Sequence, residues 1–289
     1  MSDQIPVAMV RQYHSNVIFL YQQEMSVLRG KMAEKSLKGR YDYFDRIGPT
    51  TALKKTQRLM QTPRVNTPHS RRRGELVDYV WSDTLDKEDD MRILINPLAS
   101  YAQNASMAMA RAYDSEAIEA FTADAYEGET GATVTPYPTA NIIDDGGGGT
   151  GLTVAKLMAA KLAMDLVPVP VTDRHFLYSP EASLDLLVDP QVTSTDFNTV
   201  QTLVAGALTG TYMGFQYHTS ILLPVAANIR ECYAWHRDSM GMMVGRDLDV
   251  RVDVLPNLTY ATQVFVSGSF KGIRILDEGV YTVDIDESV

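Results

Sequence analysis

A stretch of 29 residues without an acidic side chain, from Arg46 to Gly74, separates two strand-like runs near the start of this chain. In both runs, residues 40–46 and 76–81, aromatic and charged side chains alternate as in a strand with one exposed face. A simple hairpin loop needs only about two to five residues. The stretch also contains three prolines, Pro49, Pro63 and Pro68. This spacing predicts a long arm with strand-like flanks that becomes ordered on a partner.

The charges of this stretch indicate an anionic partner. It holds eight of the 26 basic residues of the chain: Arg46, Lys54, Lys55, Arg58, Arg64, Arg71, Arg72 and Arg73. The rest of the chain carries the other 18 basic residues and all 36 acidic ones, so it is strongly negative. A second copy of the same chain is therefore a candidate partner beside a nucleic acid. Three adjacent guanidiniums favour an opposing carboxylate or phosphate over a merely solvated loop tip.

An acidic cluster follows the second strand-like run. It consists of Asp83, Asp86, Glu88, Asp89 and Asp90. A calcium loop would need a glycine and a distal glutamate at set positions, and this spacing lacks both. We interpret the cluster as a solvated acidic face, which is also a candidate surface to receive the basic arm of a neighbouring copy.

A glycine-rich loop is the main candidate for binding a small molecule. Gly146, Gly148 and Gly151 have the spacing of a dinucleotide-binding turn, but Asp144 and Asp145 just before them would repel a pyrophosphate. We therefore interpret the loop as a hinge or linker, and a nucleotide-binding enzyme is the minor alternative.

The other reactive side chains are better explained by structure than by chemistry. The five histidines, His14, His69, His175, His218 and His236, include no pair three or four residues apart, so a helical zinc site is not supported. Cys232, the only cysteine, lies in an apolar run typical of a buried strand. Ser179 before Pro180 has the pattern of a helix cap. We predict no catalytic residue, no cofactor and no metal, and hence no enzyme.

The same residues exclude several cellular settings. A single cysteine excludes an internal disulfide and is consistent with a reducing cytoplasm. The longest uncharged run, residues 197–229, is interrupted by polar side chains and by Pro224, so no membrane span is expected. The first residues have neither the basic flank nor the apolar run of a signal peptide.

The hydrophobic periodicity predicts a chain of mixed helices and strands. Apolar residues at steps of three and four indicate an amphipathic helix from Val10 to Met32. A second helix is expected to open at Asn96-Pro97 and to continue to about Ala125, roughly 40 Å at 1.5 Å per residue. After a loop at 127–151, further helices are expected to open at Thr153, Ser179 and Asp196, with strands at 175–178, 250–254, 260–266 and 281–285.

The order of these elements resembles the Hong Kong 97-type major capsid proteins of tailed bacteriophages. Local strings along essentially the whole chain are similar to one branch of that family: 44–48 (FDRIG), 67–73 (TPHSRRR), 101–104 (YAQN), 196–200 (DFNTV) and 260–264 (YATQV). None of them is a chemical signature, so their weight comes from their number and order. The resemblance implies an α+β, Hong Kong 97-like capsid fold with an N-terminal arm, an extended two-stranded loop, a long spine helix, a peripheral domain and an axial domain.

The resemblance also implies a division of the chain. The expected parts are an N-terminal arm and helix at 1–38, the extended loop at 39–92, the spine helix with the first part of the peripheral domain at 93–151, the axial domain at 152–255, and returning peripheral strands at 256–289.

The function implied by the resemblance is that of a non-catalytic shell protein. Many copies would assemble as hexamers and pentamers, in the cytoplasm of a host bacterium, into the icosahedral head of a virion that holds double-stranded DNA without sequence-specific contacts. A separate scaffolding protein and a portal are expected partners, a decoration protein is an optional one, and no membrane is involved. The extended loop would reach an adjacent subunit, so Lys54, Lys55, Arg58, Arg64, Arg71, Arg72 and Arg73 are expected to form intersubunit salt bridges. An encapsulin-type shell, which has the same fold but encloses enzymes, is the alternative.

Overall fold

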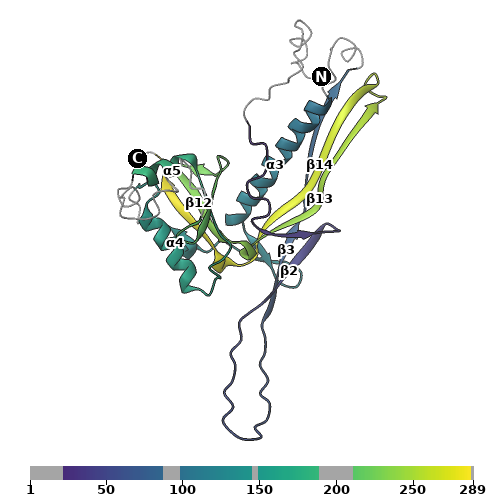
Figure 1. The fold of residues 1–289 in the computed structure, drawn as a ribbon. Helices are drawn as coiled ribbons and strands as arrows, with labels where there is room; N and C mark the ends of the chain where they lie inside the picture. Colours follow the sequence, from purple (N-terminus) through teal and green to yellow (C-terminus); the bar gives the residue numbers. More distant parts are fainter. Residues whose placement is uncertain (1–21, 87–97, 145–148, 189–210, 288–289) are drawn as a thin grey trace.

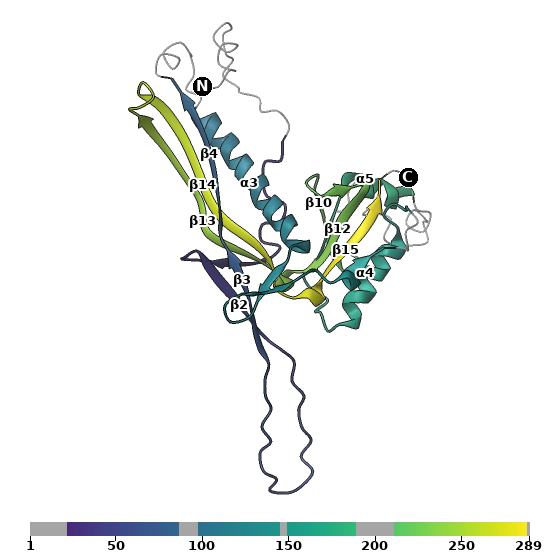
Figure 2. The same cartoon turned by 180° about the vertical axis from the view of Figure 1, so that it is seen from behind.

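One long helix sets the frame of the molecule. The computed structural model describes residues 22–86, 98–144, 149–188 and 211–287. Helix α3 (Leu98–Thr122) lies along a four-stranded sheet (Figures 1 and 2). The strand order in this sheet is β1 (Ala33–Ser36), β13 (Met240–Leu255), β14 (Ala261–Arg274) and β4 (Val77–Leu85). We call α3 and this sheet the spine layer.

Small side chains bring α3 close to the sheet. Ala117 and Ala120 are buried on the helix, and Gly272 lies beneath them on β14. A Cβ atom on Gly272 would come within 2.7 Å of Ala120 Cβ and 2.8 Å of the Glu116 carbonyl oxygen, which is closer than such atoms pack. Glycine is therefore required at this crossing. The predicted spine helix is confirmed over Leu98–Thr122, while its expected first residues, 96 and 97, lie outside the described residues.

A second sheet and two helices form what we call the α/β region. The strand order is β7 (Ile142–Ile143), β15 (Val280–Asp286), β12 (Ile229–His236), β8 (Arg174–Tyr178), β10 (Phe215–Thr219) and β9 (Thr211–Tyr212), and β11 (Val225–Ala226) pairs with β12. Helices α4 (Val154–Leu166) and α5 (Pro180–Val188) begin where predicted. Thr153 Oγ1 accepts a hydrogen bond from the Lys156 N–H at 3.3 Å, and Ser179 Oγ accepts one from the Ala182 N–H at 3.1 Å. The helix expected at Asp196 lies outside the described residues.

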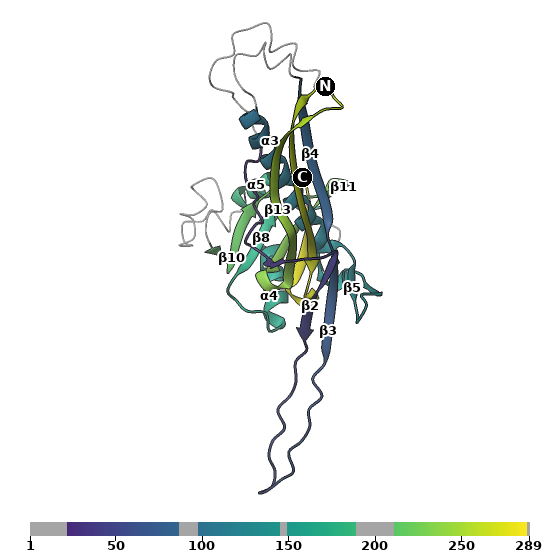
Figure 3. The ribbon, with the colours of Figure 1, turned by 90° about the vertical axis from the view of Figure 1, so that its right-hand side faces the viewer.

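A third sheet carries a long protruding loop. Its strand order is β2 (Tyr41–Ile47), β3 (His69–Glu75), β5 (Ala125–Glu127) and β6 (Thr133–Thr135). The chain between β2 and β3, residues 48–68, extends away from the other elements (Figures 1 and 3). We call residues 48–68 the finger. Short 3-10 turns join the remaining elements: η1 (Thr139–Asn141), η2 (Arg237–Ser239) and η3 (Asp277–Gly279).

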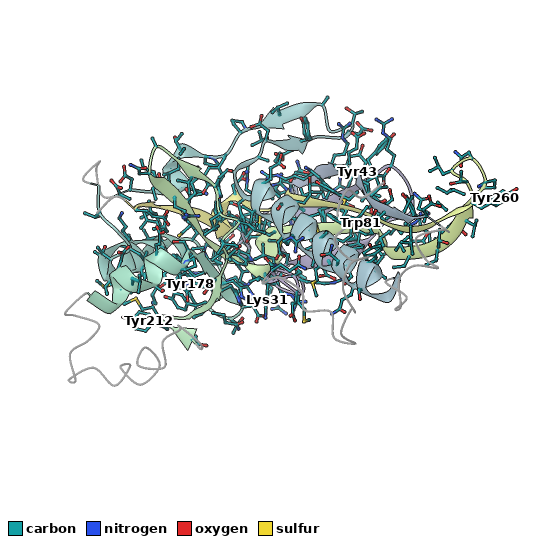
Figure 4. All side chains as sticks on the ribbon, turned by 90° about the horizontal axis from the view of Figure 1, so that it is seen from above. Lys31, Tyr43, Trp81, Tyr178, Tyr212 and Tyr260 are labelled. Carbon is teal, nitrogen blue, oxygen red and sulfur yellow. The ribbon has the colours of Figure 1, made fainter. Side chains whose placement is uncertain are left out.

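The spine layer and the α/β region share one hydrophobic core. Phe121 of α3 stacks on Tyr233 of β12 with ring centroids 4.5 Å apart, and its ring centroid lies 5.0 Å from that of Trp235. Trp235 also donates its Nε1–H to the Lys31 carbonyl at 3.0 Å. Figure 4 shows Lys31 between the two regions and Tyr260 at the far end of the β13–β14 hairpin. The two regions are therefore packed directly against each other.

The helix predicted from Val10 to Met32 is absent over residues 22–32, the part of it that the structure describes. The Asp114 carboxylate on α3 accepts hydrogen bonds from the backbone N–H groups of Val27 at 2.9 Å and Leu28 at 3.2 Å. These bonds give the two backbone N–H groups an acceptor on α3, so the segment does not need helical hydrogen bonds to satisfy them. Tertiary hydrogen bonding therefore overrides the apolar periodicity of this segment.

The strand pairs differ from those suggested by the sequence. Residues 77–81 of the second run lie in β4, which pairs with β14. The partner of β2 is β3, which lies almost entirely inside the basic stretch. The boundary expected between 255 and 256 separates β13 from β14, although these strands pair with each other. In contrast, β15 pairs with β12 in the α/β region. Local alternation predicts strands but not their partners, because partners come from distant parts of the chain.

Two of the scattered histidines meet in the α/β sheet. Nδ1 of His175 on β8 lies 3.1 Å from Nε2 of His218 on β10. Burial lowers the pKa of each imidazole to about 4, and the positive charge of Lys31 acts in the same direction. His175 is further lowered by His218 and, weakly, by His236, while Asp173 opposes the shift. The pair is therefore neutral in the folded chain at pH 7.

We expect this pair to make the fold sensitive to mild acid. The unfolded chain binds protons on these imidazoles below about pH 6.5, whereas the folded pair stays neutral until about pH 4. Stability should therefore fall as the pH drops through this interval. Thermal unfolding between pH 7 and pH 4.5 measures this loss of stability. Over that range the Tm of the variant His218→Gln should decrease less than the Tm of wild type. His69→Gln changes an exposed histidine and should leave the decrease intact; equal curves for wild type and His218→Gln would contradict the assignment.

Candidate assembly surface

The finger presents positive charge and apolar side chains to solvent. Lys54, Lys55, Arg58 and Arg64 are all exposed, as are the apolar residues Leu53, Leu59 and Val65. The Gly48 N–H donates to the Pro68 carbonyl at 2.9 Å, which closes the β2–β3 ladder. Beyond that bond, no backbone hydrogen bond joins residues 49–67 to the described residues outside the finger. The finger is thus an extended loop whose polar backbone and apolar side chains are both uncovered.

The three adjacent arginines of β3 do not act as a group. Arg72 points into its own chain and is 1% exposed. Its guanidinium donates to both Asp277 carboxylate oxygens, at 2.9 and 2.5 Å, and to the Arg274 carbonyl at 2.8 Å. Within the described chain, the expected anionic partner of Arg72 is therefore an internal aspartate. Alternation along β3 explains this, because neighbouring side chains point to opposite faces of the sheet.

The flanking arginines lie on the surface of the third sheet. Arg71 pairs with Asp45 on β2, with Nε 3.1 Å from Oδ1, and lies over the Tyr43 ring. Arg73 donates to the Thr130 carbonyl at 3.2 Å and lies over two tyrosine rings, those of Tyr41 and Tyr126. These contacts order both guanidiniums while leaving each of them partly exposed.

A buried charge cluster anchors the base of the finger. Arg274 donates its Nε–H to Asp277 at 2.6 Å and its Nη1–H to the Ala123 carbonyl at 2.7 Å, just after α3. Burial alone would raise the pKa of Asp277, but the hydrogen bonds from Arg72 and Arg274 outweigh it and hold the pKa below its usual value. Next to this group, Arg46 of β2 pairs with Glu127 of β5. The cluster joins β3, β14 and the end of α3, so it holds the finger in a defined direction relative to the spine layer.

The predicted acidic surface is only partly within the described chain. Asp83 lies on β4 and Asp86 follows that strand, whereas Glu88, Asp89 and Asp90 lie outside the described residues. The structure adds acidic residues that the sequence analysis missed: Asp78 on β4 and Asp247, Asp249 and Asp253 on β13. Asp78 belongs to the alternating run at 76–81 and Asp253 to the one at 250–254, and such alternation predicts a strand without indicating a binding surface. We call Asp78, Asp83, Asp86, Asp247, Asp249 and Asp253 the acidic spine surface, which includes both faces of the sheet. Asp78, Asp249 and Asp253 pair with Ser269, Ser267 and Gln263 on the face away from α3, whereas Asp83 pairs with Val264 on the face that α3 covers.

The glycine-rich loop is closed to phosphate at its described end. The backbone N–H of Leu152, at the start of α4, already donates to Asp185 Oδ2 at 2.9 Å. A Cβ atom on Gly151 would come within 2.3 Å of the same carboxylate. An anion would therefore meet a negative charge where a nucleotide site offers backbone N–H groups. Residues 145–148 lie outside the described residues.

The remaining candidates for chemistry have structural positions. Cys232 is fully buried in β12, and burial raises the pKa of its thiol to about 12, as predicted for an inert cysteine. In the described part of the chain, no three His, Cys, Asp or Glu side chains form a group that could hold a metal ion. None of the helices described combines the length and apolar character needed to cross a bilayer.

A match to known sequences decides the family. Residues 5–287, nearly the whole chain, match the phage capsid protein family. The chain belongs to this family. The match confirms the predicted capsid function, and it favours a phage shell over the encapsulin-type alternative. A comparison with curated proteins finds no match.

Solved structures show that this capsid protein has the fold of phage capsid chains. A chain of the cyanophage P-SCSP1u capsid aligns with a TM-score of 0.75 at 14% identity, covering 95% of this chain and 92% of that chain. The mature capsid of bacteriophage PhiM1 aligns at 0.68 with 13% identity, covering 96% and 91%. A chain of Mycobacterium phage Che8 aligns at 0.67 with 14% identity, covering 96% and 97%. The predicted α+β, Hong Kong 97-like capsid fold is confirmed.

Proposed function

We propose that copies of this capsid protein join through the finger of one copy and the acidic spine surface of the next, and so build the icosahedral head of a tailed double-stranded DNA phage. The observation that carries the proposal is the finger itself. It projects into solvent with four exposed basic side chains and three exposed apolar ones, and with no acidic residue. A loop of this kind would expose an apolar and unpaired segment unless a partner covers it.

Charge supports a second copy as that partner. The acidic spine surface contributes six carboxylates from β4, β13 and the residue after β4. Asp247 pairs with Arg29, and Asp249 pairs with Arg246 and Arg251, so the six carboxylates face three arginines and the surface stays negative. Opposite charges across an interface guide association and set its register. Because finger and surface lie on one chain but at different places, each copy offers one of each. Such head-to-tail contacts generate rings of subunits when the rotation between neighbours closes.

The other partners follow from the same proposal. The α/β region would surround the centre of each hexamer and pentamer, and the spine layer would lie at its periphery. Assembly in the host cytoplasm would involve a separate scaffolding protein and a portal, and a decoration protein where the shell needs one. The net charge of −10 suits a wall that does not grip packaged DNA through many phosphate contacts.

Electron microscopy of the purified chain tests the proposal. We expect closed shells of hexamers and pentamers at high protein concentration, with or without a co-expressed scaffold. Their yield should decrease at high salt, because the finger contacts include exposed charges. A chain that stays monomeric at every concentration, ionic strength and scaffold level tested would contradict the proposal.

A further inference from the structure

Leu59, near the tip of the finger, combines two unfavourable features. Its side chain is 92% exposed, and its backbone has a φ angle of 61°, in the left-handed region that disfavours a branched side chain. Glycine or asparagine would occupy such a turn with less strain. A large apolar side chain held in a strained and fully exposed position is a candidate for a contact made with another molecule.

A groove in the spine layer has the matching character. It lies between α3 and β13, has a volume of about 370 Å³, and includes Met109, Tyr113 and Phe270 among its lining side chains. The exposed Met25 and Leu248 also line it. Its charged lining residues are Glu24, Asp247 and Arg29, and Arg29 pairs with Asp247 at 2.6 Å. Glu24 leaves the charged lining with an excess of one negative charge, and an apolar groove of this kind suits Leu59, which directly follows Arg58.

The apolar lining continues beyond the groove along β13. Strand β1 pairs only with Gly241–Val244, so the described residues provide no partner strand for the far part of this edge. Val250 and Val252 are half exposed there, and they lie opposite the buried Val266 and Val264 on the sheet face that α3 covers. This stripe offers apolar contacts to Leu53 and Val65, the other exposed apolar residues of the finger.

We propose that Leu59 of one copy inserts into the spine groove of a neighbouring copy and is the apolar anchor of the finger contact. The proposal rests on the proposed function and adds the contact point to it. The finger extends away from α3 of its own chain (Figures 1 and 3), so the groove it fills belongs to another copy. The strain at Leu59 is then offset by burial of its side chain on assembly.

Cysteine crosslinking between two separately labelled chains tests the contact. One chain carries Leu59→Cys and the other Leu248→Cys, and the mixture is assembled and treated with a short bismaleimide. The native Cys232 is fully buried, so it gives no background. We expect about tenfold more crosslinked dimer in the mixture than in either variant assembled alone, because only the mixture holds the two thiols at high effective concentration.

A second groove provides the matched control. It lies at the finger base, and the exposed Leu276 lines it together with Ile47 and Pro49. Leu59→Cys mixed with Leu276→Cys should give no more dimer than the single variants. Preferential crosslinking to position 276, or intact shells without crosslinking to 248, would overturn the anchor while leaving the proposed function standing. Failure of the wild-type chain to form shells would count against both.

A glycine variant separates the effect of removing the Leu59 side chain from the effect of its backbone strain. Leu59→Gly removes the side chain but fits the same φ angle, so the unassembled chain should be as stable as wild type or slightly more so. If Leu59 is an anchor, the protein concentration needed for assembly should rise about tenfold. Unchanged assembly would overturn the proposal.

Discussion

Replacing Asp277 with asparagine should lower the free energy of unfolding of this capsid protein by about 3 to 5 kcal/mol. The variant Asp277→Asn keeps the shape of the side chain but removes its charge. It leaves two buried guanidiniums, those of Arg72 and Arg274, without the carboxylate they share. An uncompensated buried charge is among the most destabilising changes a core can suffer. Urea unfolding of the unassembled chain, followed by circular dichroism, measures the loss.

An exposed ion pair on the same sheet provides the control. Asp45→Asn breaks a contact with Arg71 in which the side chains are 70% and 43% exposed, so it should cost less than about 1 kcal/mol.

The pH dependence of the stability of Asp277→Asn gives a second check. The pKa of Asp277 is lowered in the folded chain, so its contribution is present above the unfolded pKa of about 3.9 and is lost as the pH falls below it. Wild type and Asp277→Asn should therefore converge in stability at low pH, and a constant difference would argue against the charge as the cause.

Reversing two charges on the finger should strongly reduce assembly without affecting the fold. In the double variant Lys54→Glu, Lys55→Glu, two carboxylates would face the acidic spine surface of the neighbour, and like charges at an interface cost several kcal/mol. We expect the shell yield to fall about tenfold or more. Both lysines are exposed and lie outside the helices and strands, so Tm of the unassembled chain should stay at the wild-type value.

A matched double variant shows whether assembly depends on where the charges are reversed or only on the net charge of the chain. Lys38→Glu, Arg237→Glu makes the same change in net charge at two exposed positions outside the finger. It should assemble nearly as well as wild type, and equal losses in the two variants would show that net charge, not the finger, controls assembly. Arg72 is left unchanged in both, because its burial would turn a test of assembly into a test of folding.

Local signals predicted the elements that depend on neighbouring residues. Thr153 and Ser179 cap α4 and α5 because a hydroxyl just before a helix reaches the N–H groups of the first turn in any tertiary context. The apolar spacing after Pro97 predicted α3, and the apolar run around Cys232 predicted a buried strand. The overall capsid fold was predicted by resemblance, since no periodicity specifies how three sheets share a core.

Local sequence patterns gave wrong predictions where a residue far along the chain decides the conformation. The apolar residues of the segment at 22–32 have helical spacing, yet the Asp114 carboxylate on α3 accepts hydrogen bonds from two of its backbone N–H groups. The arginines at 71–73 were treated as one charged group, but the pleat of β3 turns Arg72 inward and leaves Arg71 and Arg73 at the surface. The spine groove was invisible for the same reason, because its walls come from α3, β13 and the segment before β1.

The amino-acid sequence alone determined the uneven charge of this capsid protein and the starts of its capped helices, because those properties depend only on residue type and short-range spacing. Only the tertiary structure decided which basic groups are free to meet a neighbour. Asp277 lies 205 residues from Arg72 along the chain, and it becomes the partner of that arginine only because β3 and β14 are brought together at the end of α3. A guanidinium is neutralised by the carboxylate that packing places nearest to it, and packing is a property of the whole fold.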